Sequence, residues 1–118
     1  MPITETEENE ENVSYVEDAE TREFIRKVVM EDPGESVYIL PKEGSDEILT
    51  EKRMEIIRTL REEDVKSIRS LARILERDVS AVSRDLEILW ENDIIEYREE
   101  QNRKIPELTT DKIVVEPF

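Results

Sequence analysis

The side chains in this sequence best suited to chemistry are the basic and hydroxyl groups between Lys66 and Arg84. This window contains five basic and two acidic residues, whereas the 118-residue chain has a formal net charge of −15. Guanidinium, ammonium and hydroxyl groups donate hydrogen bonds to phosphate oxygens and to the edges of nucleic-acid bases. The window therefore offers groups that recognise a polyanion.

Several kinds of catalytic and metal site are excluded by the residue types that the chain lacks. There is no cysteine and no histidine, which removes disulfides, thiolate or imidazole metal ligands, and Ser/His or Cys/His nucleophile pairs. With two glycines the chain has no glycine-rich phosphate loop, and no pair of acids is marked out by its spacing. We expect a protein that is not an enzyme and needs neither metal nor cofactor.

A short helix is predicted to begin after Ser67, a residue type favoured as an N-cap. Apolar residues then recur at intervals of three and four, at Ile68, Leu71, Ala72 and Leu75. The small side chain of Ala72 would let a second helix approach closely. This helix is therefore expected to pack against the one that follows it.

A longer helix is predicted from Ala81 to about Asn92, with Ser80 as its N-cap and Val82, Leu86 and Leu89 on its inner face. Two such helices, joined by a short turn and crossing steeply, form a helix-turn-helix. In that motif the second helix enters the major groove of DNA. The outward side chains of this helix are then the ones that would reach bases and phosphates.

A support helix and a β-hairpin are predicted on either side of this pair. Residues Thr50 to Glu63 show a stripe of Met54, Ile57 and Leu60 behind a Thr50 cap. After the helix that ends at about Asn92, the spacing of apolar residues falls from about 3.6 to 2. This change predicts a wing with a strand at Ile94 to Arg98, a polar tip at Glu99 to Lys104, and a return strand at Ile105 to Leu108, which Pro106 confines to a sheet edge.

The N-terminal part of the sequence differs in composition. Residues 1–17 are rich in glutamate and have few apolar side chains to bury, so we expect a disordered acidic leader. Residues 18–48 form an extension with a helix at Asp18 to Met30 and an edge strand at Ser36 to Leu40. A further β-prone run, Lys112 to Glu116, would either extend the wing sheet or pair with the Ser36 to Leu40 strand.

These elements predict an α+β protein. The expected architecture is a winged helix-turn-helix at residues 49–118, with a three-helix core and a β-hairpin wing. An N-terminal extension precedes it at 18–48 and the leader at 1–17. A chain of this length has room for one such domain.

Within this architecture Arg84 is the best candidate for reading a guanine, because a guanidinium can donate two parallel hydrogen bonds to O6 and N7. Arginines of the helix pair would contact phosphates, serines would contact phosphates or base edges, and wing side chains would reach the backbone or a minor groove. The expected DNA contacts are Ser67, Arg69, Arg73, Arg77, Ser80, Ala81, Ser83, Arg84, Glu87, Arg103 and Lys104.

Each of these side chains also has an ordinary structural interpretation. Surface arginines pair with nearby carboxylates, which for Arg84 would be Glu87 or a neighbour of Asp85. Ser80 would act only as a helix cap, and Arg103 with Lys104 would belong to a solvated turn. The sequence leaves both interpretations open.

A subunit interface is predicted from apolar residues that face away from the core. Trp90 follows the inward Leu89, so its indole should be exposed, as a subunit contact or as a cover over the N-terminal segment. Phe24 and Val28 of the N-terminal helix are the other candidates. The expected assembly is a homodimer that places two reading helices in successive major grooves.

The acidity and the apolar pattern bear on where the protein works. No apolar run approaches the length of a membrane span, and the N-terminus does not resemble a signal peptide, so we expect a soluble cytoplasmic protein without a membrane partner. The acidity fits an acidic tail together with a halophilic surface, although composition alone does not separate a halophile from another acidic protein.

The stretch from Ser67 to Ile95 resembles the helix-turn-helix of MarR-like and ArsR-like winged-helix repressors, with a capped Leu-Ala helix, a Val-Ser-Arg-x-Leu helix and an Ile-Ile strand. More closely, LTEKRMEIIRTLRE, SIRSLAR, RDVSAVSRDLEIL and RKIPELTTDKIVVEPF are similar to a family of short archaeal, largely haloarchaeal, DNA-binding proteins. The similarity covers roughly Ser36 to Phe118 and not the leader. It implies a winged-helix fold, usually dimeric, acting as a transcriptional regulator.

Two functions from different classes follow from the sequence. The first is a sequence-specific regulator that binds double-stranded DNA through the helix Ser80 to Asn92, with wing contacts from Arg103 and Lys104. The second is a winged-helix protein-interaction module, or a mimic of DNA, that does not bind DNA. In the second case the basic window would be paired within the molecule.

Overall fold

The computed structural model of the chain describes residues 19–117. Within this range the fold is mixed α and β. Its helices are α2 (Ala19–Glu31), α3 (Ser45–Ile48), α4 (Glu51–Glu62), α5 (Ile68–Leu75) and α6 (Val79–Glu91). Its strands are β1 (Val37–Leu40), β2 (Ile95–Glu100), β3 (Arg103–Leu108) and β4 (Lys112–Val115). The α+β class is therefore confirmed, and the predicted disorder of residues 1–17 lies outside the described residues.

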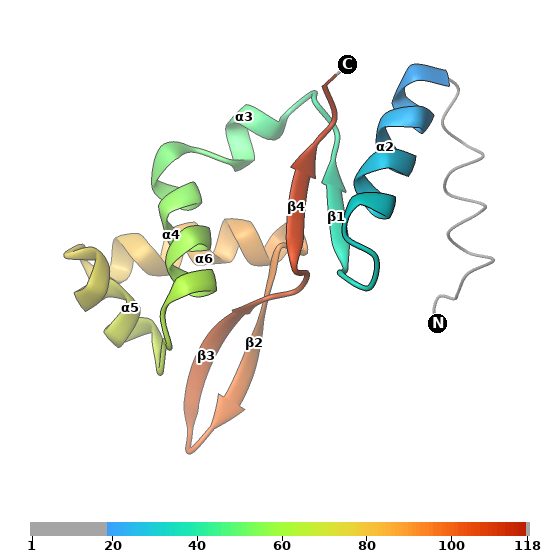
Figure 1. The fold of residues 1–118 in the computed structure, drawn as a ribbon. Coiled ribbons are helices and arrows are strands. Elements are labelled where there is room, and N and C mark those ends of the chain that lie inside the picture. Colours follow the sequence, from blue (N-terminus) through green and yellow to red (C-terminus); the bar gives the residue numbers. More distant parts are fainter. Residues whose placement is uncertain (1–18, 118) are drawn as a thin grey trace.

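The core lies where α4, α5 and α6 meet, to one side of the β1–β4 sheet (Figure 1). The inner side of α6 is fully buried at Val82, Leu86 and Leu89, as the sequence predicted, and Leu71 and Ala72 of α5 are buried with them. Burial of each large aliphatic side chain contributes about 1.5 to 3 kcal/mol. Helix α6 is therefore held firmly by one face while its other face stays outside the core.

The apolar stripe of α4 differs from the predicted one. Met54 is 42% exposed, whereas Ile56 and Ile57 are buried. A spacing of three residues falls short of the 3.6-residue turn, so a stripe drawn through Met54, Ile57 and Leu60 drifts around the helix. The face that packs is centred on Ile56, Ile57 and Leu60, and the prediction that Met54 belongs to it is wrong.

Two of the three predicted helix caps are confirmed. The Thr50 side chain accepts a hydrogen bond from the backbone N–H of Arg53. Ser67 and Ser70 form a reciprocal capping box at the start of α5. Such caps contribute about 1 kcal/mol each because they satisfy backbone N–H groups that the helix leaves unpaired.

The third cap prediction is wrong, because α6 begins at Val79 with Asp78 as its N-cap residue. The Ser80 hydroxyl therefore lies inside the first turn, where it donates a hydrogen bond of 3.0 Å to Asp78 Oδ2. Asp78 has the extended backbone that an N-cap requires. Two cap-type residues so close together made the start ambiguous in the sequence, and the partly buried Val79 extends the helix toward Asp78.

Strands β2 and β3 form an antiparallel hairpin, with Glu100 opposite Arg103. Only Gln101 and Asn102 lie in the turn, and both have positive φ angles, of 52° and 64°. Two-residue turns of this kind match the twist of the flanking strands. The strands are therefore longer, and the tip shorter, than the predicted loop from Glu99 to Lys104.

Strand β4 pairs with β1 in parallel, from Val37 opposite Lys112 to Leu40 opposite Val115. This settles the alternative that the sequence left open, in which β4 would have extended the hairpin sheet. The start of the sheet is held by Ser36 and Asp111, whose backbone N–H groups each donate to the other's side chain at 2.9 Å. The first and last strands of the described chain therefore lie side by side.

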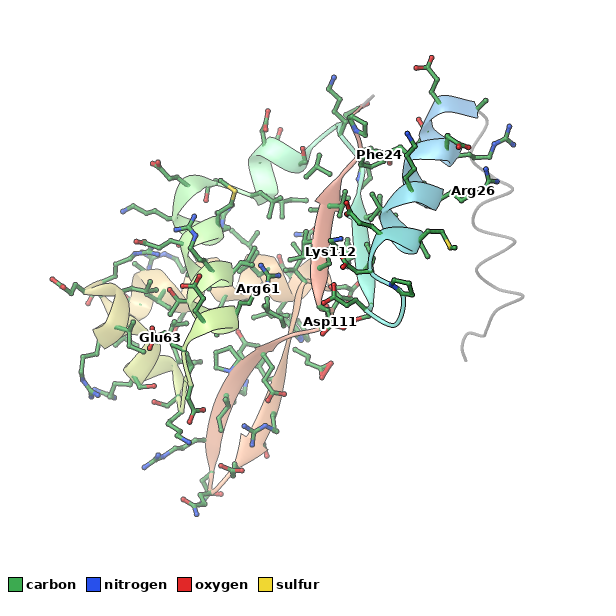
Figure 2. All side chains as sticks on the ribbon, in the orientation of Figure 1. Phe24, Arg26, Arg61, Glu63, Asp111 and Lys112 are labelled. Carbon is green, nitrogen blue, oxygen red and sulfur yellow. The ribbon has the colours of Figure 1, made fainter. Side chains whose placement is uncertain are left out.

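Helix α2 lies on the side of this sheet away from α4, α5 and α6 (Figure 1). It covers nearly the predicted range. Lys112 of β4 ties the end of α2 to the sheet, because its Nζ lies 2.7 Å from Asp32 and 3.3 Å from Glu31 (Figure 2). The hydrogen bond to Asp32 contributes most to raising the pKa of Lys112, and the hydrogen bond to Glu31 raises it further.

Candidate nucleic-acid interface

The outward face of α6 carries the side chains that the sequence assigned to base reading. Arg84 and Glu87 are exposed on it, with Ser83 and Ala81 partly exposed. Among residues 19–117, Arg84 takes part in no ion pair and no hydrogen bond of its side chain. The alternative in which Arg84 pairs with Glu87 or with a neighbour of Asp85 is therefore absent from this structure.

A shallow groove of about 530 Å³ runs between the first turn of α4 and the outer side of α6. Its lining brings Ala81 and Arg84 together with Lys52 of α4. Lys52 is exposed and has no ion-pair partner within the described part of the chain. Sequence reasoning missed Lys52, because no spacing along the chain relates the start of α4 to the side of α6.

The arginines of α5 are exposed as expected. Arg69 and Arg73 make no ion pair with any residue between 19 and 117. Lys66, just before the helix, pairs instead with the exposed Asp64 at 2.8 Å. The Ser67 hydroxyl accepts from the N–H of Ser70, so its position is set by the cap.

Arg77 lies in a different place from the one that the sequence suggested. Its Nη2 lies 2.7 Å from Asp85 Oδ2, and Arg53 Nε lies 3.1 Å from Asp85 Oδ1. The three side chains are only 14%, 15% and 14% exposed for Arg77, Asp85 and Arg53. Arg77 is therefore part of a largely buried Arg53–Asp85–Arg77 triad and is not available to a phosphate in this arrangement.

The triad connects α6 with two neighbouring parts of the chain. Arg53 comes from α4, Arg77 from the turn after α5, and Asp85 from α6 itself. Arg53 Nη1 also donates to the backbone oxygens of Glu47 and Ile48, at 2.7 and 3.3 Å. The Arg77 Nη1 atom is buried without a hydrogen-bond partner in the described structure. Removing Asp85 would thus leave two guanidinium groups without their shared acceptor.

The triad also changes the electrostatics of α6. The sequence alone makes Asp85 an acidic residue on the helix predicted to read DNA, where its charge would repel a polyanion. Because two guanidinium groups contact its carboxylate, the triad has a formal charge of +1. The repulsion that the sequence suggests at this position is therefore offset within the molecule.

The hairpin carries basic groups near its turn. Arg103 and Lys104 are exposed at the start of β3, and the Lys104 Nζ lies 5.3 Å from the centroid of the Tyr97 ring. Burial, followed in size by the charge of Glu87, raises the pKa of the Tyr97 hydroxyl. Arg103 forms no ion pair within residues 19–117.

Arg98 is the hairpin arginine that is already paired. Its Nε lies 2.8 Å from Glu107 and its Nη1 lies 2.8 Å from Glu100. The hydrogen bond to Glu107 is the largest influence that raises the pKa of Arg98. The basic groups of the hairpin that remain for a partner are therefore those nearest its turn.

The residues predicted at a subunit interface lie on two different elements. Trp90, near the end of α6, is 52% exposed. Phe24 and Val28 lie on α2 and are half-buried (Figure 2 labels Phe24). The sequence missed a groove of about 740 Å³ between α2 and β1, whose lining combines five apolar side chains with five polar or charged ones. The apolar ones are Ile25, Val29, Met30, Val37 and Ile39.

A third groove, of about 560 Å³, lies between the end of α4, the hairpin and the start of β4. Arg61 and Glu63 of its lining lie at the end of α4, and Asp111 lies before β4 (Figure 2). In the part of the chain from 19 to 117, no group of acidic side chains is arranged to hold a metal ion. Over the same residues, no helix combines the length and apolar character needed to cross a membrane.

The comparisons with known proteins give a family. Residues 48–115 match the family HVO_A0114, and since this range is more than half of the chain, the protein belongs to that family. No curated protein and no solved structure matches the chain. The matched range runs from the end of α3 through β4 and leaves out α2 and β1.

Proposed function

We propose that this protein is a sequence-specific regulator of transcription that binds double-stranded DNA. The fold would be a winged helix-turn-helix, with α4, α5 and α6 as its three-helix core and the β2–β3 hairpin as its wing. Helix α6 would enter the major groove as the reading helix. The single observation that carries the proposal is Arg84, an exposed arginine with no side-chain partner among residues 19–117, on a helix whose opposite face is fully buried.

The way α6 is anchored supports this role. Reading a base edge requires a side chain held in a fixed position, because bidentate hydrogen bonds are directional. Leu86 and Leu89 fix the inner face of α6, and Asp85 fixes its side to α4 and to the preceding turn. Arg84 is next to Asp85 in sequence, so the anchor acts directly beside the proposed reading residue.

Phosphate contacts would come from the elements around α6. Arg69 and Arg73 of α5 and Lys52 of α4 are exposed basic groups without ion pairs inside the described chain. In the wing, Arg103 and Lys104 are the corresponding groups. Such contacts fix the register of a protein on the duplex but read no sequence themselves. Arg77 is left out of the proposed interface because of its place in the triad.

We propose a homodimer as the active form. Exposed Trp90 and the groove between α2 and β1 are the two surfaces with the character of a subunit contact. A two-fold dimer would present two reading helices about one helical turn of DNA apart. Size measurement in solution, with Trp90→Ala and Val29→Asp as variants, would identify which surface is used.

We propose that the protein works in a cytoplasm rich in salt. The net charge of −15 and the resemblance to haloarchaeal DNA-binding proteins support it. At high salt the release of counterions from DNA contributes less to affinity, so binding would rely more on hydrogen bonds, shape and two-site attachment.

The test begins with selection of binding sequences from a pool of random duplexes. We expect one motif to be enriched. On that duplex, Arg84→Ala should weaken binding by about 1 to 3 kcal/mol and relax the preference at one base pair, as measured by fluorescence anisotropy.

The matched control is Lys27→Ala, which removes an exposed positive charge from α2. It should bind the selected duplex as the parent does. If no motif is enriched, or if Arg84→Ala binds like the control, the reading role is contradicted. Absence of saturable binding to any duplex would instead favour the interaction-module alternative.

A further inference from the structure

Three grooves formed by residues 19–117 differ in the charge of their linings. The groove at the end of α4 is lined by two basic and five acidic side chains, and the groove between α2 and β1 by two of each. The groove between the first turn of α4 and the outer side of α6, here the α4–α6 groove, is lined by four basic and two acidic side chains. These charged residues are Glu51, Lys52, Arg53, Arg77, Arg84 and Asp85.

The α4–α6 groove is therefore a positive site on an acidic chain. Its lining has a formal excess of two positive charges, whereas the whole chain has a net charge of −15. Exposed basic side chains without an ion pair also occur elsewhere, as at Lys42 and Arg58, but these two line none of the three grooves. What distinguishes this groove is that basic groups from α4, from α6 and from the turn before α6 line the same hollow.

The recessed part of the lining is the Arg53–Asp85–Arg77 triad. Arg53 and Arg77 are each 14% exposed, and the carboxylate of Asp85 neutralises only one of their two charges. Arg77 Nη1 is buried and has no hydrogen-bond acceptor among residues 19–117. A buried donor without an acceptor is unfavourable. This part of the lining therefore retains one positive charge and one unused donor.

The exposed part of the lining adds two further cations. Lys52 of α4 and Arg84 of α6 are both exposed, and neither forms an ion pair with a residue between 19 and 117. An ammonium and a guanidinium group from two elements can donate to different oxygens of one anion. Both side chains are free to do so, because no carboxylate of the described chain competes for them.

A phosphate monoester is the anion whose charge and size fit this lining. It carries a charge of about −1.5 to −2 at neutral pH and has three acceptor oxygens, whereas a carboxylate carries one charge and has two oxygens. The groove volume of about 530 Å³ lies in the range of small-molecule sites and exceeds what a phosphate group alone would fill. Ala81 and Ile88 provide apolar lining for an organic group attached to the phosphate.

We infer that the α4–α6 groove binds a small phosphate monoester, with its phosphate held by Lys52 and Arg84 and its organic part against Ala81 and Ile88. This site is a claim about the groove alone. One consequence rests on the proposed function: a ligand that engages Arg84 withdraws this side chain from DNA, so ligand and duplex compete. A backbone phosphate of DNA is a diester with a single charge and matches the excess of two less well.

The site is tested without DNA, with phenyl phosphate as the probe. Backbone amide shifts of the isotope-labelled full chain are followed by NMR at constant ionic strength, so that general screening stays the same. We expect saturable shifts at Lys52, Ala81 and Arg84, and only small shifts without saturation at Arg69 and Arg73. Benzyl alcohol, which has the ring but no phosphate, and dimethyl phosphate, which has the single charge of a diester, should give no saturable shifts.

Three surface variants identify the groups that hold the phosphate. Lys52→Gln and Arg84→Gln should each weaken binding of phenyl phosphate about tenfold, because each removes a charge-assisted hydrogen bond. Lys42→Gln is the matched control, since it removes an exposed, unpaired charge outside the groove. It should bind the probe as the parent does. All three positions are exposed and lie outside the triad, so each variant should fold like the parent.

Several outcomes overturn the site whether or not the protein binds DNA. These are the absence of saturable shifts with phenyl phosphate, shifts of equal size at Arg69 and Arg73, and an equal loss of binding in Lys42→Gln. Binding of dimethyl phosphate as tight as that of phenyl phosphate would likewise assign the groove to a DNA backbone phosphate. Saturable binding in the groove of a chain that binds no duplex would support the site and contradict the proposed function.

The competition is measured on the selected duplex. Phenyl phosphate at about nine times its own Kd should raise the apparent Kd for DNA about tenfold, because only the ligand-free fraction binds. In Lys52→Gln, whose affinity for the probe is about tenfold lower, the same concentration should raise it only about twofold. An unchanged Kd for DNA in the parent, at a probe concentration that saturates the groove, would overturn the competition.

Discussion

Two regions of this molecule are held together by different means. The part from α4 through the β2–β3 hairpin packs around a continuous apolar core and lies within the range that matches the family. Helix α2 and strand β1 precede that range. Strand β1 pairs with β4 and buries Leu40 in the same core, whereas α2 contributes no residue to that core and is tied to β4 by the ion pairs of Lys112 with Glu31 and Asp32. Buried apolar contacts give large and local stability, whereas exposed ion pairs give little. The region from α4 through the hairpin therefore holds the larger share of the stabilising apolar burial.

Among the variants that test this comparison, one that breaks the Arg53–Asp85–Arg77 triad should lower the free energy of unfolding most. Asp85→Ala leaves the largely buried guanidinium groups of Arg53 and Arg77 without their shared acceptor. Loss of one partner of a buried charge pair costs about 3 to 5 kcal/mol. We expect the free energy of unfolding, measured in denaturant, to fall by about that amount. The exposed neighbour Glu87→Ala is the control and should change it by less than about 0.5 kcal/mol.

An intermediate effect is expected at the junction of the two regions. The Tyr38 hydroxyl of β1 donates a hydrogen bond of 2.7 Å to the backbone oxygen of Asn92, just after α6. Tyr38→Phe removes this bond and keeps the ring, so it should cost about 1 kcal/mol. Hydrogen exchange should show faster opening of β1 and β4, with α5 unchanged. Equal acceleration in both would mean that the two regions do not open separately.

The smallest effect is expected at the end of α2. Lys112→Gln removes the ion pairs to Glu31 and Asp32, which are exposed, so the unfolding midpoint should fall only slightly. In the parent, the hydrogen bond to Asp32 raises the pKa of Lys112 above its value in the unfolded chain. The stabilisation from this shift is complete below the unfolded pKa and is lost as the pH rises through the higher folded pKa. The difference between parent and variant should therefore be constant near neutral pH and shrink at strongly alkaline pH.

The local features of the fold were predictable from the sequence, and the long-range ones were not. The caps at Thr50 and Ser67 and the inner face of α6 depend on residues within a turn or two of each other. The triad joins Arg53 to Asp85 across 32 positions, and no spacing marks that partnership. For the same reason the sequence placed Arg77 among the phosphate contacts, since an arginine near a helix start looks the same whether it faces solvent or a carboxylate.

The pairing of β4 was left open for a related reason. A short β-prone run specifies that a strand forms, but its partner depends on which edge the folded core leaves available. Here Tyr38 and Leu40 pack inward from β1, which places that strand beside the core and gives β4 an edge to join. The two-residue turn of the hairpin was not predicted either. It requires positive φ angles at both Gln101 and Asn102, and the sequence did not indicate that both residues would adopt them.

The parallel pairing of β1 with β4 has a consequence for biosynthesis. Strand β1 emerges early from the ribosome, but its partner is the last strand of the described chain to be made. Until then Tyr38 and Leu40 lie on a strand with no hydrogen-bonding neighbour, while α4, α5 and α6 can already associate through contacts closer in sequence. A nascent chain would therefore assemble α4, α5 and α6 before β1 is paired, and premature termination a few residues before Lys112 would leave β1 without its partner strand while sparing α4, α5 and α6.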